Sequence, residues 1–212
     1  GSRVNAKGWD LSDPLDLQRL DKARELFRFE TGRAGPMVDS NLTRGVGCAT
    51  YNPADPADCV GRVEEAGSQH VEMALAAADR CRSWLGLVGR ERAGCLERVA
   101  ELYEQNTGEL LALATREAGK TLLDGINEVR EAVDFLRYYA DRARRLNDRS
   151  APRGIVACVS PWNFPLAIFT GQISAALAAG NCVIAKPAEQ TPLMALRAVE
   201  LMHEAGIPKD VL

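Results

Sequence analysis

The sequence lacks a surplus of either charge. Its 26 lysine and arginine residues are balanced by 29 aspartate and glutamate residues, a net charge of −3, so no strongly basic surface points to nucleic acid as the main partner. Hydrophobic residues make up 46% of the chain and charged residues 26%, a composition that excludes a disordered tail. The length fits one sizeable domain, or one domain with an appendage.

Closely spaced cysteines are also missing. The six cysteines form no CxxC pair and no cluster with histidine, so we expect neither a disulfide framework nor a metal site, and reduced thiols favour the cytoplasm. No charged-then-apolar signal peptide opens the chain. The two histidines, His70 and His203, have no sequence neighbours that suggest a catalytic triad, and we expect surface or helix-capping roles for them. The cysteines are Cys48, Cys59, Cys81, Cys95, Cys158 and Cys182.

An unbroken apolar run of membrane-spanning length is absent as well. Residues 154–185 carry no charge, but Pro161, Asn163 and Pro165 interrupt them, whereas a membrane helix needs about 20 continuous apolar residues. We interpret the segment as a buried strand, a turn and a buried helix, and exclude a transmembrane segment.

Three regions follow from the patterning. Residues 1–44, rich in glycine and with one short apolar helix, predict an arm or linker. Residues 45–150 predict a hairpin followed by helices. Within them, Asn106 with Glu109 and Thr121 with Asp124 are both spaced as helix-starting capping pairs, and the second begins a long amphipathic helix.

Residues 151–212 predict an α/β unit of the order strand, helix, strand, helix. The run 155–159 is mostly β-branched, as expected of a parallel strand covered on both faces. Helices over 166–179 and 192–205 end at Gly180 and Gly206, which are typical C-cap residues. Short connections favour a right-handed parallel sheet, and such a sheet needs further strands on its edges.

Polar residues follow both predicted strands, where open α/β sheets bind ligands. Asn163 offers an uncharged amide from a proline-rich turn, while Lys186 and Glu189 could donate to and accept from a pair of sugar hydroxyls. Each feature also has a common structural explanation. An asparagine in such a turn more often bonds to local backbone, and a Lys–Glu pair at a strand end is usually a solvated surface pair.

The combination of motifs carries more weight than its parts. The turn PWNFP (161–165) is followed by KPAEQTPL (186–193), and EAGK (117–120) and RYYA (137–140) precede them. With these motifs the chain resembles the aldehyde dehydrogenase superfamily, and within it looks most like the semialdehyde dehydrogenase half of the proline utilization A branch, which GWDL (8–11) also fits. The resemblance implies the helical part and the first βαβα units of a Rossmann-like NAD-binding domain, incomplete relative to the whole fold.

The resemblance also implies residue roles. Asn163 corresponds to the amide that stabilises the oxyanion, and Lys186 and Glu189 to the residues that hold the adenosine ribose. A carboxylate at Glu189 would repel a 2′-phosphate and so favours NAD over NADP. FAD is implied only if a proline dehydrogenase half precedes this segment. The remaining residues expected to line the cofactor groove are Val159, Ser160, Pro161, Trp162 and Ala188.

The family's nucleophilic cysteine and general-base glutamate are expected beyond Leu212. Gly171–Ser174 resembles the nucleophile motif only by coincidence, since Ser stands where Cys is required. A two-stranded oligomerisation hairpin found in many relatives has no room between Arg145 and Gly154. The unpaired strand edges nevertheless favour self-association.

By this resemblance the parent protein oxidises the small-molecule aldehyde L-glutamate γ-semialdehyde to L-glutamate with NAD. Two alternatives stay open. One is another aldehyde dehydrogenase, such as one acting on succinate semialdehyde. The other is a non-catalytic fragment that serves as a structural or interaction module.

Overall fold

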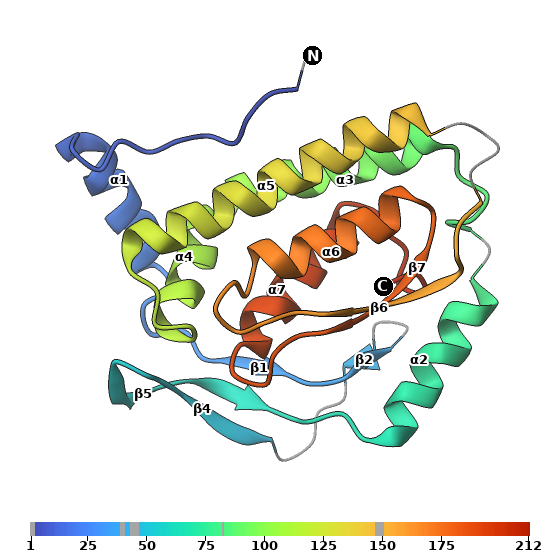
Figure 1. Ribbon diagram of the computed structural model, residues 1–212. Helices are drawn as coiled ribbons and strands as arrows, with labels where there is room; N and C mark the ends of the chain where they lie inside the picture. Colours follow the sequence, from blue (N-terminus) through green and yellow to red (C-terminus); the bar gives the residue numbers. More distant parts are fainter. Residues whose placement is uncertain (1–2, 39–40, 43–46, 82, 147–150) are drawn as a thin grey trace.

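A computed structural model of the chain describes residues 3–38, 41–42, 47–81, 83–146 and 151–212 (Figure 1). Part of the link predicted between Arg145 and Gly154 lies outside these residues. The described elements, in chain order, are α1 (Pro14–Glu25), β1 (Gly32–Ala34), β2 (Met37–Val38), β3 (Asn41–Leu42), β4 (Cys48–Asn52), β5 (Asp55–Val63), α2 (Ser68–Arg80), α3 (Gly89–Gln105), α4 (Thr107–Arg116), α5 (Leu122–Arg145), β6 (Ile155–Val159), α6 (Ala167–Ala178), β7 (Cys182–Lys186) and α7 (Pro192–Glu204).

The predicted α/β unit is present at the carboxyl end of the chain. Strands β6 and β7 are parallel, with Ile155 opposite Cys182 and Val159 opposite Lys186. The helix between them, α6, is followed two residues after its last residue by Gly180 with φ +86°, and α7 is followed in the same way by Gly206 with φ +98°. Both glycines therefore occupy the left-handed region that favours them, as predicted.

The helical region forms a layer against this unit. In Figure 1, α3 and α5 lie together along one side of the molecule, and α6 lies between them and strands β6 and β7. Fully buried Trp84, Tyr103 and Phe169 belong to one core shared by the two parts. The indole of Trp84 donates to the carbonyl of Leu177 over 3.0 Å, which satisfies its buried N–H.

Both helices start where the capping pairs predicted, with Asn106 and Thr121 in the N-cap positions, but only the second pair forms a capping hydrogen bond. Thr121 accepts a hydrogen bond from the backbone N–H of Asp124 at the start of α5. Asn106 instead donates to the carbonyl of Leu102 at the end of α3, and Glu109 binds Arg197. Helix α4 begins only two residues after α3 ends, so Asn106 has φ −97° and ψ 20° rather than the extended backbone that capping requires.

The first 44 residues are joined to the rest more closely than an arm or linker would be. The predicted hairpin is formed by β4 and β5, and β1 pairs in parallel with β5 in a sheet of order β1-β5-β4. Leu20 of α1 is fully buried. The boundary predicted at residue 44 lies outside the described residues, and β1, which precedes it, belongs to the same sheet as the hairpin.

In this chain strand β6 is covered on one face only, whereas its sequence pattern is that of a strand covered on both. Cys158 is buried, but Ile155 is 38% and Val159 63% exposed. Alternate side chains of a strand point to opposite faces, so one face of β6 joins the core and the other lies open. None of the described helices combines the length and apolar character needed to cross a bilayer.

Candidate functional site

The two predicted ligand-binding turns lie side by side. Val159 ends β6 opposite Lys186, which ends β7, and the backbone N–H of Ser160 donates to the carbonyl of Lys186 over 3.2 Å. Both turns therefore leave the sheet at the same edge, where open parallel sheets present their ligand sites.

The first turn projects from this edge. Ser160 is 6% exposed and forms the buried base of the turn, whereas Trp162 and Phe164 are 54% and 39% exposed. Asn163 lies between these two aromatic residues and is also exposed. Its amide is thus accessible at the end of the sheet, as an oxyanion donor needs to be.

The second turn carries the predicted cation and carboxylate as a pair. The Nζ of Lys186 lies 3.3 Å from Oε2 of Glu189, and their side chains are 60% and 67% exposed. The pKa of Glu189 is below its usual value, first because its own backbone N–H bonds to the carboxylate and then because Lys186 does. An exposed pair of this kind contributes little to stability, so both groups are free to exchange partners with a ligand.

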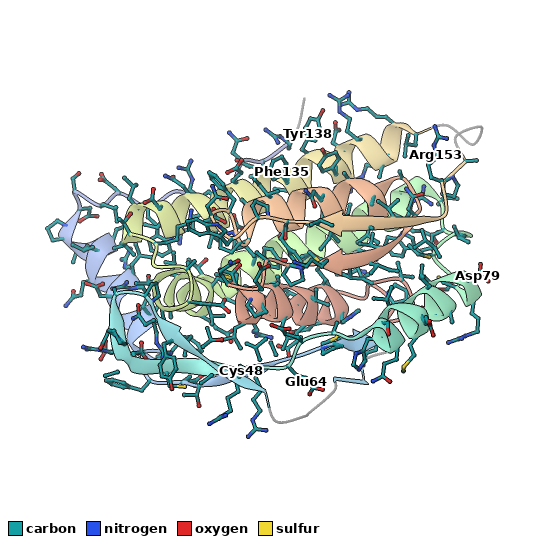
Figure 2. The ribbon with its side chains drawn as sticks, turned by 60° about the horizontal axis from the view of Figure 1, so that its bottom comes forward. Cys48, Glu64, Asp79, Phe135, Tyr138 and Arg153 are labelled. Carbon is teal, nitrogen blue, oxygen red and sulfur yellow. The ribbon has the colours of Figure 1, made fainter. Side chains whose placement is uncertain are left out.

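A cavity of about 760 Å³ adjoins the second turn. Its lining, over the part of the chain that the structure describes, takes in Lys186, Ala188 and Glu189 of the predicted site residues, and none of Val159–Asn163. The opposite wall comes from the segment after β1, from the hairpin and from α2. Cys48 and Glu64, labelled in Figure 2, lie at one end of the hairpin and belong to this wall.

No pattern in the sequence predicted that these segments line a cavity opposite the second turn. Hairpin, α2 and β7 are far apart along the chain, and only their packing brings them to one cavity. The volume lies within the usual 300–1,000 Å³ of ligand pockets.

Two buried glutamates hold the helices that follow the turns. Oε2 of Glu128 accepts the N–H groups of Leu166 and Ala167 at 3.0 and 2.9 Å, at the start of α6. Glu117 accepts those of Leu193 and Met194 at 2.7 and 2.8 Å, at the start of α7. Negative charge is favoured at a helix N-terminus. In the sequence, Glu117 stands out only as the first residue of the motif EAGK (117–120), and no motif or spacing points to Glu128.

The two carboxylates differ in their further partners. Glu117 is 4% exposed, and burial raises its pKa to about 7, against the lowering effect of its two backbone donors. Glu128 is 2% exposed and also forms an ion pair with Lys120, whose Nζ lies 3.2 Å from Oε1.

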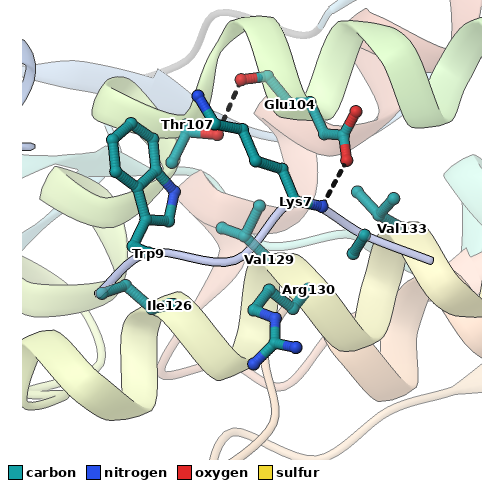
Figure 3. Close-up of a pocket in the computed structure, with 9 residues that line it drawn as sticks. Lys7, Trp9, Glu104, Thr107, Ile126, Val129, Arg130 and Val133 are labelled. Carbon is teal, nitrogen blue, oxygen red and sulfur yellow. Dashed lines mark hydrogen bonds between the residues drawn. The ribbon is translucent and has the colours of Figure 1, made fainter. Parts of the chain in front are cut away.

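A second hollow lies where the N-terminal segment crosses α3 and α5. Figure 3 shows the backbone N–H of Lys7 bound to Glu104, beside Trp9 and Val129. Its volume is about 10 Å³, room for a single water molecule at most. This hollow is a packing cleft and does not compete with the larger cavity as a ligand site.

The other candidate groups have structural roles. The Nδ1 of His70 accepts the N–H of Gly67 at the start of α2, as the capping prediction expects, and Nδ1 of His203 lies 3.0 Å from the carbonyl of Ile207. Ser174, in the motif judged coincidental, is fully buried and donates to the carbonyl of Gly171. Within the described ranges no three His, Cys, Asp or Glu side chains gather as a metal site would need.

A Rossmann-like pair of strands whose carboxyl ends carry PWNFP and KPAEQTP defines the class of protein. The sequence profile of the aldehyde dehydrogenase family matches residues 42–212, and this chain belongs to that family.

Within the family, the chain is similar to two kinds of relative. The chain is 46% identical to the bifunctional protein PutA of Escherichia coli (strain K12) over 99% of its own length and 16% of that protein. It is 31% identical to a 1-pyrroline-5-carboxylate dehydrogenase of Geobacillus sp. (strain WCH70), over 96% of this chain and 43% of the relative. A structure of 1-pyrroline-5-carboxylate dehydrogenase from Thermus with bound NAD superposes with a TM-score of 0.90 at 29% identity, covering 100% of this chain and 45% of that one. The chain therefore spans less than half the length of these relatives.

Proposed function

We propose that the protein carrying this chain is an NAD-dependent aldehyde dehydrogenase that oxidises L-glutamate γ-semialdehyde to L-glutamate in proline catabolism. The main support is the 46% identity to PutA over 99% of the chain, together with 1-pyrroline-5-carboxylate dehydrogenases among the structural neighbours. The six cysteines, all within the described residues, form no disulfides, which supports a reducing, cytoplasmic location.

The size of the cavity beside β7 supports the proposal of a dinucleotide as its ligand. Its volume of about 760 Å³ suits a large ligand, and the Lys186–Glu189 pair stands at its edge with both side chains exposed. In this proposal Lys186 donates to, and Glu189 accepts from, the hydroxyls of the adenosine ribose. Ala188 lines the same cavity. Val159, Ser160, Pro161 and Trp162 are outside its lining, and we assign them to a continuation of the cofactor groove along the first turn.

Asn163 is proposed as the oxyanion donor. NAD, when bound, accepts the hydride from the substrate carbon. The amide N–H of Asn163 would bond to the aldehyde oxygen as negative charge develops on it, and so lower the barrier to attack by a nucleophile. That nucleophile and the general base belong to other parts of the protein in this proposal, since no residue of this chain is assigned to either role.

The test is NADH formation by the complete protein, followed by absorbance with L-glutamate γ-semialdehyde or succinate semialdehyde as substrate. Asn163→Ala is expected to lower kcat about 100- to 1,000-fold, the usual cost of removing one oxyanion donor. The matched control is Asn5→Ala, since Asn5 is also exposed but lies on the N-terminal segment.

Two results would overturn this assignment. If the protein prefers succinate semialdehyde, it is a different aldehyde dehydrogenase from the one proposed. If Asn163→Ala keeps kcat within about threefold of the wild type, Asn163 is not the oxyanion donor. Absence of NADH formation with any aldehyde would favour a structural or interaction module.

We further propose that the chain associates with itself through apolar surface left open in the fold. Val159 of β6 is 63% exposed, and Val71 and Leu75 of α2 are 50% and 44% exposed. Sedimentation of the 212-residue chain should show oligomers that Val159→Asp reduces. A strictly monomeric chain would contradict this proposal.

A further inference from the structure

The turn that carries Asn163 is anchored to the helical layer at two points. One is the start of α6, where Leu166 and Ala167 donate to Oε2 of Glu128. The other is the ring of Phe164, over which the Nζ of Lys120 lies at 4.7 Å from the centroid. Because Phe164 directly follows Asn163, and Leu166 is three residues beyond it, both anchors lie immediately on the α6 side of the amide.

The two anchors are joined to each other. Lys120 lies 3.2 Å from Oε1 of Glu128, and their side chains are only 15% and 1% exposed. Glu128 thus uses one oxygen for the two backbone N–H groups and the other for Lys120. Both carboxylate oxygens of Glu128 therefore accept hydrogen bonds. The residue connects α5, the segment before α5 and the start of α6 in one buried unit.

The exposed part of the turn depends on this unit for its position. The side chain of Trp162 is 54% exposed and that of Phe164 is 39% exposed. Packing alone therefore restrains the turn weakly. An oxyanion donor acts only when it is held in place before the reaction, and a displacement of about 1 Å can lower a rate about 100-fold.

We propose that Glu128, together with Lys120, is a positioning pair that fixes Asn163 for catalysis. This inference rests on the oxyanion role proposed above for Asn163. Neither residue touches the reacting atoms in this proposal. They act by holding the start of α6 and the ring of Phe164.

The first test is Glu128→Gln in the complete protein. The amide keeps the shape of the carboxylate but places an NH₂ group where either Lys120 or the backbone donors require an acceptor. We expect kcat to fall about 10- to 100-fold, while KM for NAD changes less than about twofold, because the helix after the Lys186–Glu189 turn is held by Glu117 and not by Glu128. A purely stabilising role would instead lower the melting temperature and leave kcat of the folded enzyme unchanged, and that result would overturn the proposal.

The second test combines this substitution with Asn163→Ala. If Glu128 acts through Asn163, it has little left to position once the amide is gone, so E128Q should then cost less than about threefold in kcat. The same 10- to 100-fold loss in both backgrounds would show that Glu128 acts by another route, and would overturn the proposal.

The controls separate this inference from the function on which it rests. Glu97→Gln removes a carboxylate that pairs with Arg144 on the exposed side of α3 and α5, and should leave kcat unchanged. Lys120→Met should reproduce the E128Q effect, and it provides the comparison if E128Q does not fold. Loss of kcat in Asn163→Ala but not in the folded Glu128 or Lys120 variants would overturn the positioning role alone. Full kcat in Asn163→Ala would overturn both proposals.

Discussion

The carboxylate of Glu117 accepts the backbone N–H of Leu193 over 2.7 Å, although the two residues lie 76 positions apart. Through this bond and its companion to Met194, the end of α4 holds the start of α7. The helix that follows the turn carrying Lys186 and Glu189 is therefore fixed by a buried group from the helical layer, in the same way that Glu128 fixes α6.

The burial of Glu117, which outweighs the lowering effect of its two backbone donors, predicts a pH dependence of stability. The folded-state pKa of Glu117 is about 7, above its ordinary value of 4.5, so the folded protein holds this proton more tightly than the unfolded chain does. The stabilisation is complete below pH 4.5 and is lost as pH rises through 7, a change of about 3 kcal/mol across the window.

Urea unfolding of wild-type chain and Glu117→Gln at pH 4.5 and pH 8 measures this contribution. The unfolding free energy of the wild type minus that of Glu117→Gln should decrease as pH rises from 4.5 to 8. Groups such as His203, whose pKa is lowered by burial, contribute equally to both chains and cancel. A difference that does not vary with pH would contradict the prediction.

A buried arginine should be central to stability near the hairpin. Arg116 binds both carboxylate oxygens of Asp58, at 2.6 and 3.0 Å, and also the carbonyls of Phe27 and Glu30. Its side chain is 10% exposed. Arg116→Met should cost about 2–4 kcal/mol of unfolding free energy, because it leaves several partners unpaired.

The matched control is Arg144→Met, which breaks an ion pair whose side chains are 40% and 43% exposed. That change should cost less than about 1 kcal/mol. The pKa of Asp58 is low chiefly because Arg116 donates to it, so the stability it provides is present above its ordinary value of 3.8 and lost as pH falls. Equal losses in the two variants at pH 7 would count against this account.

Two glycines of α3 should respond to alanine with opposite signs. A Cβ on Gly89 would overlap the backbone carbonyl of Ala143, whereas one on Gly94 meets only the flexible end of Arg98, at 3.6 Å. Gly89→Ala should destabilise by about 1–3 kcal/mol, and Gly94→Ala should stabilise by about 0.5–1 kcal/mol because alanine favours the helix. Thermal unfolding measures both. Equal shifts would argue against the close approach of α3 and α5.

The charge of Glu189 should set the preference between NAD and NADP. Glu189→Gln in the complete protein should raise kcat/KM for NADP relative to NAD about tenfold, because the carboxylate no longer repels the 2′-phosphate. The effect should shrink at 1 M salt, where the screening length is about 3 Å. Glu200→Gln, a charge change away from the turn in α7, serves as the control. An unchanged ratio would place the discrimination elsewhere.

Much of the α/β unit followed from local patterns. The β-branched run at 155–159, the glycines at 180 and 206 and the motifs at both strand ends predicted the elements and their order, because strands and helix ends depend largely on nearby residues. The open face of β6 and the failed cap at Asn106 did not follow, since each depends on what packs nearby. The roles assigned to Asn163, Lys186 and Glu189 stay predictions.

The family, the order of strands and helices in the α/β unit and the polar residues at two strand ends could be read from the amino-acid sequence alone. The distant groups that hold those ends came to light only in the folded chain. Glu117 and Glu128 bond to backbone N–H groups of α7 and α6, and the hairpin and α2 close the cavity. Backbone hydrogen bonds from a distant side chain leave no periodicity or motif, so they become visible only when the chain is folded.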